Sequence, residues 1–226
     1  LVVFIHSGSR GFGYQVCDDS LKEMNRGIGK LGFELPDRQL ACAPINSDGG
    51  RRYIGQMAAA ANYAWTNRHL LMIRAMDSIM NTLKVSPATL KARLVYDVGH
   101  NNAKLEEHEY DGRSRHVWVH RKGATRSFGP GRREVPSRYR HVGQPVLVPG
   151  SMGTASYVLA GTETAMKETF GSTCHGAGRV MSRKAAVRNA RGRSIGHEMG
   201  ERGIEVMSRG RSTLAEEMPE AYKDVD

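Results

Sequence analysis

Residues 51–84 constrain the fold of this chain more than any other segment. They are rich in helix-forming residues, and apolar side chains recur there every three or four positions. That spacing places the apolar side chains on one face of a helix, so we predict one long helix over this stretch. Within it, Met72, Met76 and Met80 form a row that is typical of core packing rather than of a cofactor surface.

The other segments alternate between short apolar runs and glycine-rich turns. A second helix is expected from Gly11 to about Asn25, and a basic helix from His175 through Arg191. Strands are expected where apolar and β-branched residues cluster or alternate, at residues 1–5, 93–98, 116–120 and 146–148. Several of these strands run directly into glycine. The pattern indicates a mixed α/β chain, and we find no repeat or linker that divides it into domains.

The charge balance limits the partners that this chain would bind. Lysine and arginine outnumber aspartate and glutamate by 33 to 23, which gives a net charge of +10. Such an excess is typical of proteins that bind a polyanion such as nucleic acid, and equally of basic soluble proteins that do not. Cys17, Cys42 and Cys174 lack CxxC spacing, so no disulfide framework or zinc knuckle is expected. This cysteine pattern fits a reducing, cytoplasmic setting best. The apolar runs are too short to span a bilayer.

Two histidines each follow a predicted strand. His6 comes directly after residues 1–5, and His100 comes after residues 93–98, each beside a turn of small residues. Ligands of α/β sheets collect at the carboxyl ends of strands, and two neutral imidazoles there suit a transition metal. The alternative is that each histidine binds a nearby loop carbonyl. The repeated placement favours the metal site.

The turn at residues 149–156, PGSMGTAS, offers closely spaced backbone N–H groups and three hydroxyls. Such a turn can hold a phosphate or a nucleotide. Glycine and serine are also the commonest turn residues, and this turn matches neither a P-loop nor a Rossmann fingerprint. A nucleotide site and an ordinary turn therefore both stay open here.

Basic residues gather in the glycine-rich segments. The sequence HRKGATR places three cations around Gly123. A basic turn is usually a solvated one, but together with cations elsewhere it could form a phosphate-binding track. The six cations of that track would be Arg10, Arg121, Lys122, Arg126, Arg179 and Arg183.

The segment HGAGRVMSR, residues 175–183, looks unfavourable for the start of a helix. Arg179 and Arg183 would lie four residues apart near the positive end of the helix dipole, where cations are disfavoured and repel each other. A missing anion would explain both features. Because His175 precedes two glycines, a phosphoryl or nucleotidyl group could reach its imidazole, so His175 is a candidate nucleophile. The alternative is a histidine that caps a helix.

Six motifs together resemble those of the RtcB-type RNA-splicing ligases. In the order of the chain they are HSGSRGFG (6–13), DVGHNNAK (97–104), HRKGATR (120–126), PGSMGTASYVL (149–159), HGAGRVMSR (175–183) and EEMPEAYKDVD (216–226). The resemblance implies a complex α+β architecture, in which strands end in glycine-rich turns around one active site. It implies one incomplete catalytic domain over residues 1–226.

The family joins RNA ends that bear a 2′,3′-cyclic phosphate or 3′-phosphate to ends that bear a 5′-hydroxyl, with GTP and manganese (Mn2+). The resemblance implies that His175 is the nucleophile that forms a covalent guanylate, and that His6 and His100 bind one manganese ion. The residues that it implies for the guanylate are His100, Asn101, Pro149, Gly150, Ser151, Met152, Ser156, His175, Gly176, Ala177, Gly178 and Tyr222, the last by stacking on guanine. The residues that it implies for RNA phosphates are Arg10, Lys122, Arg179 and Arg183.

The chain departs from the family pattern at both ends. Upstream acidic, cysteine and Asn-His motifs that complete a two-manganese site, and a C-terminal lysine that contacts guanine, do not occur in residues 1–226. We therefore expect the C-terminal portion of a longer ligase that acts on tRNA halves or broken RNA, with a helper protein as a further partner. Two other functions stay open: an RNA-binding module without catalysis, and a metal-dependent phosphoesterase.

Overall fold

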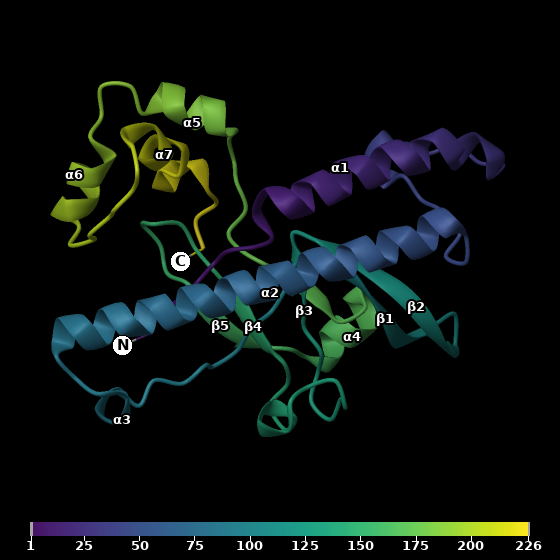
Figure 1. The fold of residues 1–226 in the computed structure, drawn as a ribbon, viewed down its shortest axis with the longest axis horizontal. Helices are drawn as coiled ribbons and strands as arrows, with labels where there is room; N and C mark the ends of the chain where they lie inside the picture. The colour runs from purple at the N-terminus through teal and green to yellow at the C-terminus, as the bar shows by residue number, and fades with distance from the viewer. Residues whose placement is uncertain (1, 226) are drawn as a thin grey trace. The chain divides into compact units, whose positions relative to one another are not determined.

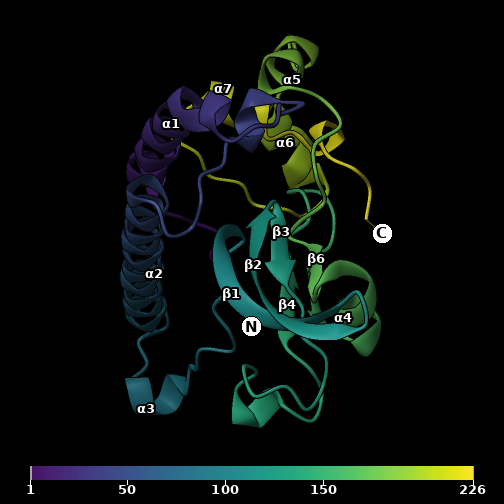
Figure 2. The same ribbon diagram turned by 90° about the vertical axis from the view of Figure 1, so that its right-hand side faces the viewer.

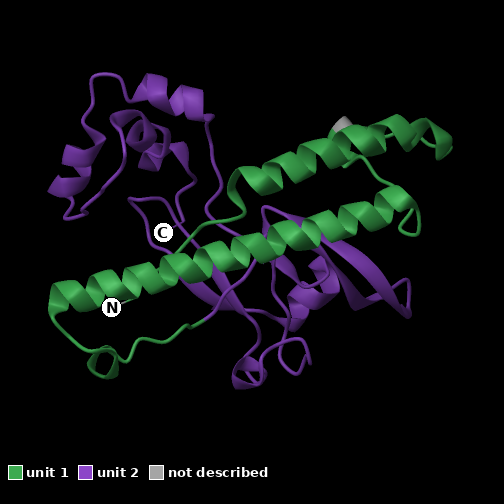
Figure 3. Ribbon diagram, viewed as in Figure 1, with its two compact units in different colours: residues 1–95 green, residues 96–226 purple. Residues whose placement is uncertain are grey.

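The computed structural model describes residues 2–225. The chain divides into two compact units, residues 1–95 and 96–226, which are coloured separately in Figure 3. Each unit is described by itself below. The expectation of a single catalytic domain stays a prediction.

The first unit is built on two antiparallel helices, α1 (Arg10–Gly27) and α2 (Asp48–Leu83). Figure 1 shows them side by side. Contacts near both ends of α1 show the antiparallel direction: the ring centroids of Phe12 and Tyr63 lie 5.7 Å apart, and Arg52 donates to Glu23 at 2.7 Å. The Ser47 hydroxyl caps α2 by accepting from the Gly50 N–H at 3.1 Å. Both predicted helices are confirmed.

The described residues of the first unit also form three short helices. They are η1 (Ile28–Lys30), η2 (Arg38–Leu40) and α3 (Pro87–Leu90). The predicted strands at residues 1–5 and 93–98 are wrong, because residues 2–5 and 93–98 form neither helix nor strand. A strand needs a neighbour to satisfy its backbone N–H and C=O groups, and the described residues pair no strand with either segment.

The described part of the second unit contains three two-stranded antiparallel sheets (Figures 1 and 2). The largest is a hairpin of β1 (Asn101–Tyr110) and β2 (Arg113–Lys122), which contains the predicted strand 116–120. The two residues of its turn, Asp111 and Gly112, have φ of 55° and 68°, as a tight hairpin turn requires.

Of the two smaller sheets, one joins segments that are far apart in the sequence and the other joins neighbouring strands. In one, β3 (Ala124–Arg126) pairs with β6 (Ser172–Cys174); in the other, β4 (Pro145–Val148) pairs with β5 (Tyr157–Ala160). The predicted strand 146–148 is thus confirmed, and the glycine-rich turn lies between β4 and β5 as expected. Two short helices, η3 (Ser137–Tyr139) and α4 (Glu163–Thr169), lie between these strands in the sequence. The mixed α+β class is borne out.

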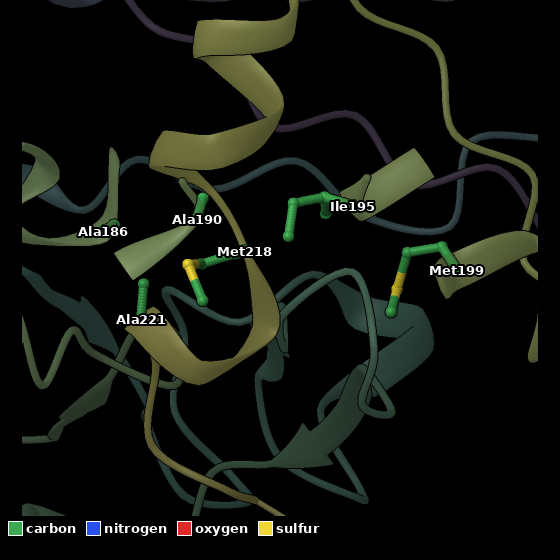
Figure 4. Close-up of a cluster of buried hydrophobic side chains, with 6 residues drawn as sticks. All are labelled: Ala186, Ala190, Ile195, Met199, Met218 and Ala221. Atoms are coloured by element: carbon green, nitrogen blue, oxygen red, sulfur yellow. The ribbon is translucent and has the colours of Figure 1, made fainter. Parts of the chain in front are cut away.

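A cluster of alanine, isoleucine and methionine side chains forms a core near the C-terminus (Figure 4). Its elements are α5 (Arg183–Asn189), α6 (Ile195–Glu201) and η4 (Pro219–Ala221), and α7 (Arg211–Glu216) packs beside them. The buried members are Ala186, Ala190, Ile195, Met199, Met218 and Ala221. Among the described residues, none of the helices is long and apolar enough to cross a membrane.

The predicted helix start at His175 is wrong by eight residues. The helix α5 begins at Arg183. The Ser182 hydroxyl caps its start by accepting from the Ala185 N–H at 3.2 Å. Gly178 has φ +75°, a conformation that interrupts a helix. Residues 175–182 are therefore a loop between β6 and α5.

A candidate active site in the second unit

Two strand pairings bring His100, Asn101 and His175 to one glycine. The β1–β2 ladder aligns Asn101 with Lys122, and the β3–β6 ladder aligns Ala124 with Cys174. Gly123 lies between β2 and β3, so it is next to Asn101 on one side and next to His175 on the other. Its φ of +66° is the left-handed conformation that glycine adopts most readily.

The hydrogen bond of His175 determines which of its ring nitrogens carries a proton. Nδ1 lies 2.7 Å from the carbonyl oxygen of Gly123. A carbonyl can only accept, so Nδ1 is the donor, and in the neutral ring the lone pair is on Nε2. His175 is half-buried, so its imidazole is partly sheltered from water while Nε2 has the electron pair that a nucleophile or ligand needs.

His100 stacks on His175. Their ring centroids lie 4.2 Å apart with 23° between the planes, and a ligand nitrogen of each ring lies within 4.8 Å of one on the other. Two imidazoles at this separation are chemically suited to a divalent transition metal. His6 belongs to the first unit, where it is exposed, and its metal-binding role stays a prediction.

The loop after His175 packs against the end of β4. The Ala177 N–H donates to the Pro149 carbonyl at 3.1 Å. At Gly176 a Cβ atom would lie only 3.2 Å from the same carbonyl oxygen, so glycine permits this approach. The two segments expected to bind the guanylate, residues 149–152 and 175–178, are thereby side by side.

Hydroxyls close the turn between β4 and β5. The Gly150 N–H donates to the Ser156 hydroxyl at 3.1 Å, and the Ser151 N–H donates to the Thr154 hydroxyl at 2.9 Å. These bonds hold the turn in one conformation by using its own backbone donors. The Met152 side chain packs against the hydrophobic core near the C-terminus, and this contact also holds the turn in place.

Arg179 and Tyr222 form a cluster with two glutamates. Arg179 donates to the Tyr222 hydroxyl at 2.9 Å, to the Glu217 carboxylate at 3.2 Å and to the Glu216 carbonyl at 2.6 Å. The Tyr222 hydroxyl in turn donates to Glu217. Burial, and then the hydrogen bond to this carboxylate, raise the pKa of Tyr222, so its hydroxyl stays protonated at neutral pH.

Arg183 joins the same glutamates. Its guanidinium lies 3.0 Å from Glu216 and 2.7 Å from Glu217, and the hydrogen bond to Glu216 raises its pKa further. The interpretation of an unpaired arginine couple at a helix start is therefore wrong. Arg179 lies in the loop before α5, and protein carboxylates supply an anion for both arginines.

Two cations of the expected phosphate track bind other residues of the protein. Arg121 is buried on β2 and binds both carboxylate oxygens of Glu106 at 2.8 Å. It also donates to the Ser172 hydroxyl at 2.8 Å and to the Phe170 carbonyl at 2.8 Å, which ties β2 to the start of β6. Arg126 donates to Gln144 at 3.0 Å. Arg121 is therefore not available to a phosphate, which corrects this part of the expectation. Arg126 is half-buried, and its role toward phosphate stays a prediction.

The remaining expected phosphate contacts are exposed. Lys122 ends β2 and points away from the buried face on which Arg121 lies, because successive strand residues alternate. Arg10 is exposed in the first unit, where it begins α1 with φ +55°. Their roles toward RNA stay predictions.

Comparison with known proteins identifies the family. The family model described as "tRNA-splicing ligase RtcB" matches residues 1–226. The chain belongs to the RtcB family. The RtcB protein of Archaeoglobus fulgidus, named tRNA-splicing ligase RtcB, is 56% identical over 99% of this chain and 46% of its own length. Relatives of the same name from Methanococcus maripaludis and Pyrococcus abyssi are 50% and 55% identical over the whole chain, and 47% and 25% of their own length.

The chain thus spans about half, or a quarter, of the length of the RtcB relatives that it matches. The predicted resemblance to the RtcB family is confirmed. The expectation that the chain is a C-terminal portion agrees with its partial coverage of these relatives.

Two contributors to the candidate site were missed in the sequence. They are the Gly123 carbonyl and the Glu216–Glu217 pair. For Glu216 and Glu217 a signal was present, since both lie in the motif EEMPEAYKDVD close to Tyr222. A backbone carbonyl gives no comparable signal.

Proposed function

We propose that this chain carries the nucleophile and part of the RNA site of a GTP- and manganese-dependent RNA ligase. The ligase would join RNA ends that bear a 2′,3′-cyclic phosphate or 3′-phosphate to 5′-hydroxyl ends, in tRNA splicing or RNA repair. Membership of the RtcB family supports the class of reaction. The observation that carries the proposal is the Nδ1 hydrogen bond of His175 to Gly123, which leaves the lone pair on Nε2.

In the first step, Nε2 of His175 attacks the α-phosphorus of GTP. A phosphorus–nitrogen bond forms, the bond from the α-phosphorus to the bridging oxygen of the β-phosphate breaks, and pyrophosphate leaves. The positive charge that develops on the ring is stabilised by the Gly123 carbonyl at Nδ1. Residues 149–152 and 176–178, which lie together, are where the nucleotide would be held.

His100 is proposed as a ligand of the manganese ion that the family resemblance implies. His100 offers an imidazole nitrogen beside the reacting ring, and imidazole is a suitable ligand for a divalent transition metal. Manganese, when bound, would supply positive charge that lowers the repulsion between phosphate groups and an attacking nucleophile. His6 is proposed as a second ligand of the same ion.

In the later steps the guanylate leaves His175 and is used to join the RNA ends. A 3′-phosphate oxygen attacks the guanylate phosphorus, the phosphorus–nitrogen bond breaks, and His175 is restored. The 5′-hydroxyl oxygen then attacks the RNA phosphorus, loses its proton and displaces GMP. Arg10, Lys122, Arg179 and Arg183 are proposed to bind RNA phosphates during these steps. An end that carries a 2′,3′-cyclic phosphate would first be opened by water to the 3′-phosphate.

The proposed partners follow from the proposed reaction. They are RNA, GTP and a helper protein, with no membrane partner, and the proposed location is the cytoplasm. The net charge of +10 supports a polyanionic substrate.

A ligation assay with the gene-complete protein tests the proposal. One RNA bears a 3′-phosphate, a second bears a 5′-hydroxyl, and GTP and manganese are supplied or omitted. We expect a joined product that requires both, is lost in His175→Ala and is kept in His197→Ala, a matched change at an exposed histidine of α6. RNA binding without joining, or phosphate release without GTP, would contradict the ligase and support a binding module or a phosphoesterase respectively.

A further inference from the structure

Asn101 and His175 bind opposite sides of the same glycine. The N–H of Gly123 donates to the Asn101 side-chain oxygen at 3.1 Å, and the carbonyl of Gly123 accepts from Nδ1 of His175 at 2.7 Å. The partner of an N–H must be an acceptor, so the oxygen of the Asn101 amide, not its nitrogen, faces Gly123. One residue thereby connects the start of β1 with the nucleophile.

A glycine in this position needs to be held at both ends. Glycine has more backbone freedom than any other residue, so its carbonyl can turn away from His175 at little cost. The β3–β6 ladder holds the chain after Gly123, through the pairing of Ala124 with Cys174. Asn101 holds the chain before the carbonyl, at the amide nitrogen of Gly123.

We propose that Asn101 is a positioning residue, which acts through the Gly123 peptide to keep His175 in the tautomer with the proton on Nδ1. This inference rests on the proposed function, in which Nε2 is the attacking atom. It gives Asn101 a role in addition to the contact with the guanylate that the family resemblance implies. If the carbonyl of Gly123 turned away, the proton could move to Nε2, and that nitrogen would no longer be nucleophilic.

Three variants of the gene-complete protein separate this role from others. Asn101→Leu keeps the approximate size of the side chain and removes the acceptor. Asn101→Asp keeps an oxygen acceptor and removes the amide donors. Asn102→Leu is the matched control, because the neighbouring strand residue points to the opposite face of β1. If Asn101→Leu fails to fold, Asn101→Ala removes the same acceptor without added bulk.

The first readout is the tautomer itself, observed without GTP or metal. Nitrogen NMR of protein labelled with 15N-histidine distinguishes a protonated ring nitrogen from one with a lone pair, and the His175→Ala spectrum assigns the signals. We expect the Nδ1–H tautomer in the wild type, in Asn101→Asp and in Asn102→Leu, and a mixture of tautomers in Asn101→Leu. A single Nδ1–H tautomer in Asn101→Leu would overturn the proposal.

The second readout separates positioning from nucleotide binding. For a positioning role, the guanylation rate of Asn101→Leu at saturating GTP falls by about 10- to 100-fold with KM nearly unchanged, and Asn101→Asp restores most of the rate. A raised KM with an unchanged rate would make Asn101 a nucleotide contact only and overturn the inference. Because the NMR measurement needs no GTP, a wild type that shows the tautomer but no guanylation would contradict the proposed function alone.

Discussion

Arg121 and Arg183 both lie in basic motifs, yet their surroundings differ. The side chains of Arg121 and its partner Glu106 are 2% and 3% exposed, whereas that of Arg183 is 62% exposed. A buried ion pair cannot lose one partner without leaving an unpaired charge in the interior, but an exposed pair exchanges easily with water or another anion. The comparison shows that burial, not the basic motif, separates a structural arginine from one that is available to a phosphate.

Removing Arg121 gives the largest expected effect. Arg121→Met leaves the Glu106 carboxylate buried without its partner, so the free energy of unfolding should fall by about 3–5 kcal/mol. Denaturant-induced unfolding measures the change. Lys122→Met, the exposed neighbour, should change it by less than about 0.5 kcal/mol. Equal losses in the two variants would contradict the contrast between buried and exposed cations.

Acid should weaken the same buried pair. Burial by itself raises the pKa of Glu106, but the hydrogen bonds from Arg121 and His108 outweigh burial and hold the pKa below its usual 4.5. A lowered folded-state pKa adds stability at pH values above 4.5, and that stability is lost as the pH falls through the folded value.

Unfolding followed from pH 7 to pH 3 measures this loss. The wild type should lose stability over the acid part of the range, and Glu106→Gln should lose less there because its side chain does not titrate. Glu109→Gln, at an exposed position of β1, should follow the wild type. Parallel curves for the wild type and Glu106→Gln would be the contrary result.

Arg179 is intermediate between the two extremes. Its side chain is 24% exposed, and it binds Glu217, Tyr222 and a carbonyl. Arg179→Ala should reduce the free energy of unfolding by about 1–2 kcal/mol, because Tyr222 and Glu217 lose a charged donor. A change as large as that of Arg121→Met, in the same unfolding experiment, would show that the cluster is more buried than we describe.

Arg183→Ala should have the smallest effect on stability, below about 1 kcal/mol, because its pairs are exposed. Its effect should appear instead in RNA binding. The slope of log affinity against log salt concentration should fall by about 1, as for one lost phosphate contact. An unchanged slope, with RNA affinity intact, would mean that Glu216 and Glu217 are the only anions that Arg183 binds.

Local patterns predicted the parts of the fold that depend on local interactions. The helix α2 follows from its apolar period, and the strand at 116–120 follows from its alternation. The strands expected at 1–5 and 93–98 failed because an apolar run does not specify a pairing partner.

The sequence predicted some residues of the candidate site but not all of their contacts. His100 and His175 were both singled out from their glycine-rich surroundings, and their rings are stacked. The ion pairs of Arg179 and Arg183 were not foreseen, because Glu216 and Glu217 are distant in the sequence. The helix start after His175 was misplaced, although Ser182, a favoured capping residue, marks the true start.

Transfer of label from GTP to His175 tests the central claim most directly. The gene-complete protein is incubated with manganese and GTP labelled at the α-phosphate, and the labelled peptide is identified by mass spectrometry. We predict an acid-labile, hydroxylamine-tolerant adduct on His175 that is absent in His175→Ala and present in His197→Ala. Undiminished labelling of His175→Ala, or label on another residue of the wild type, would contradict the assignment of His175 as the nucleophile.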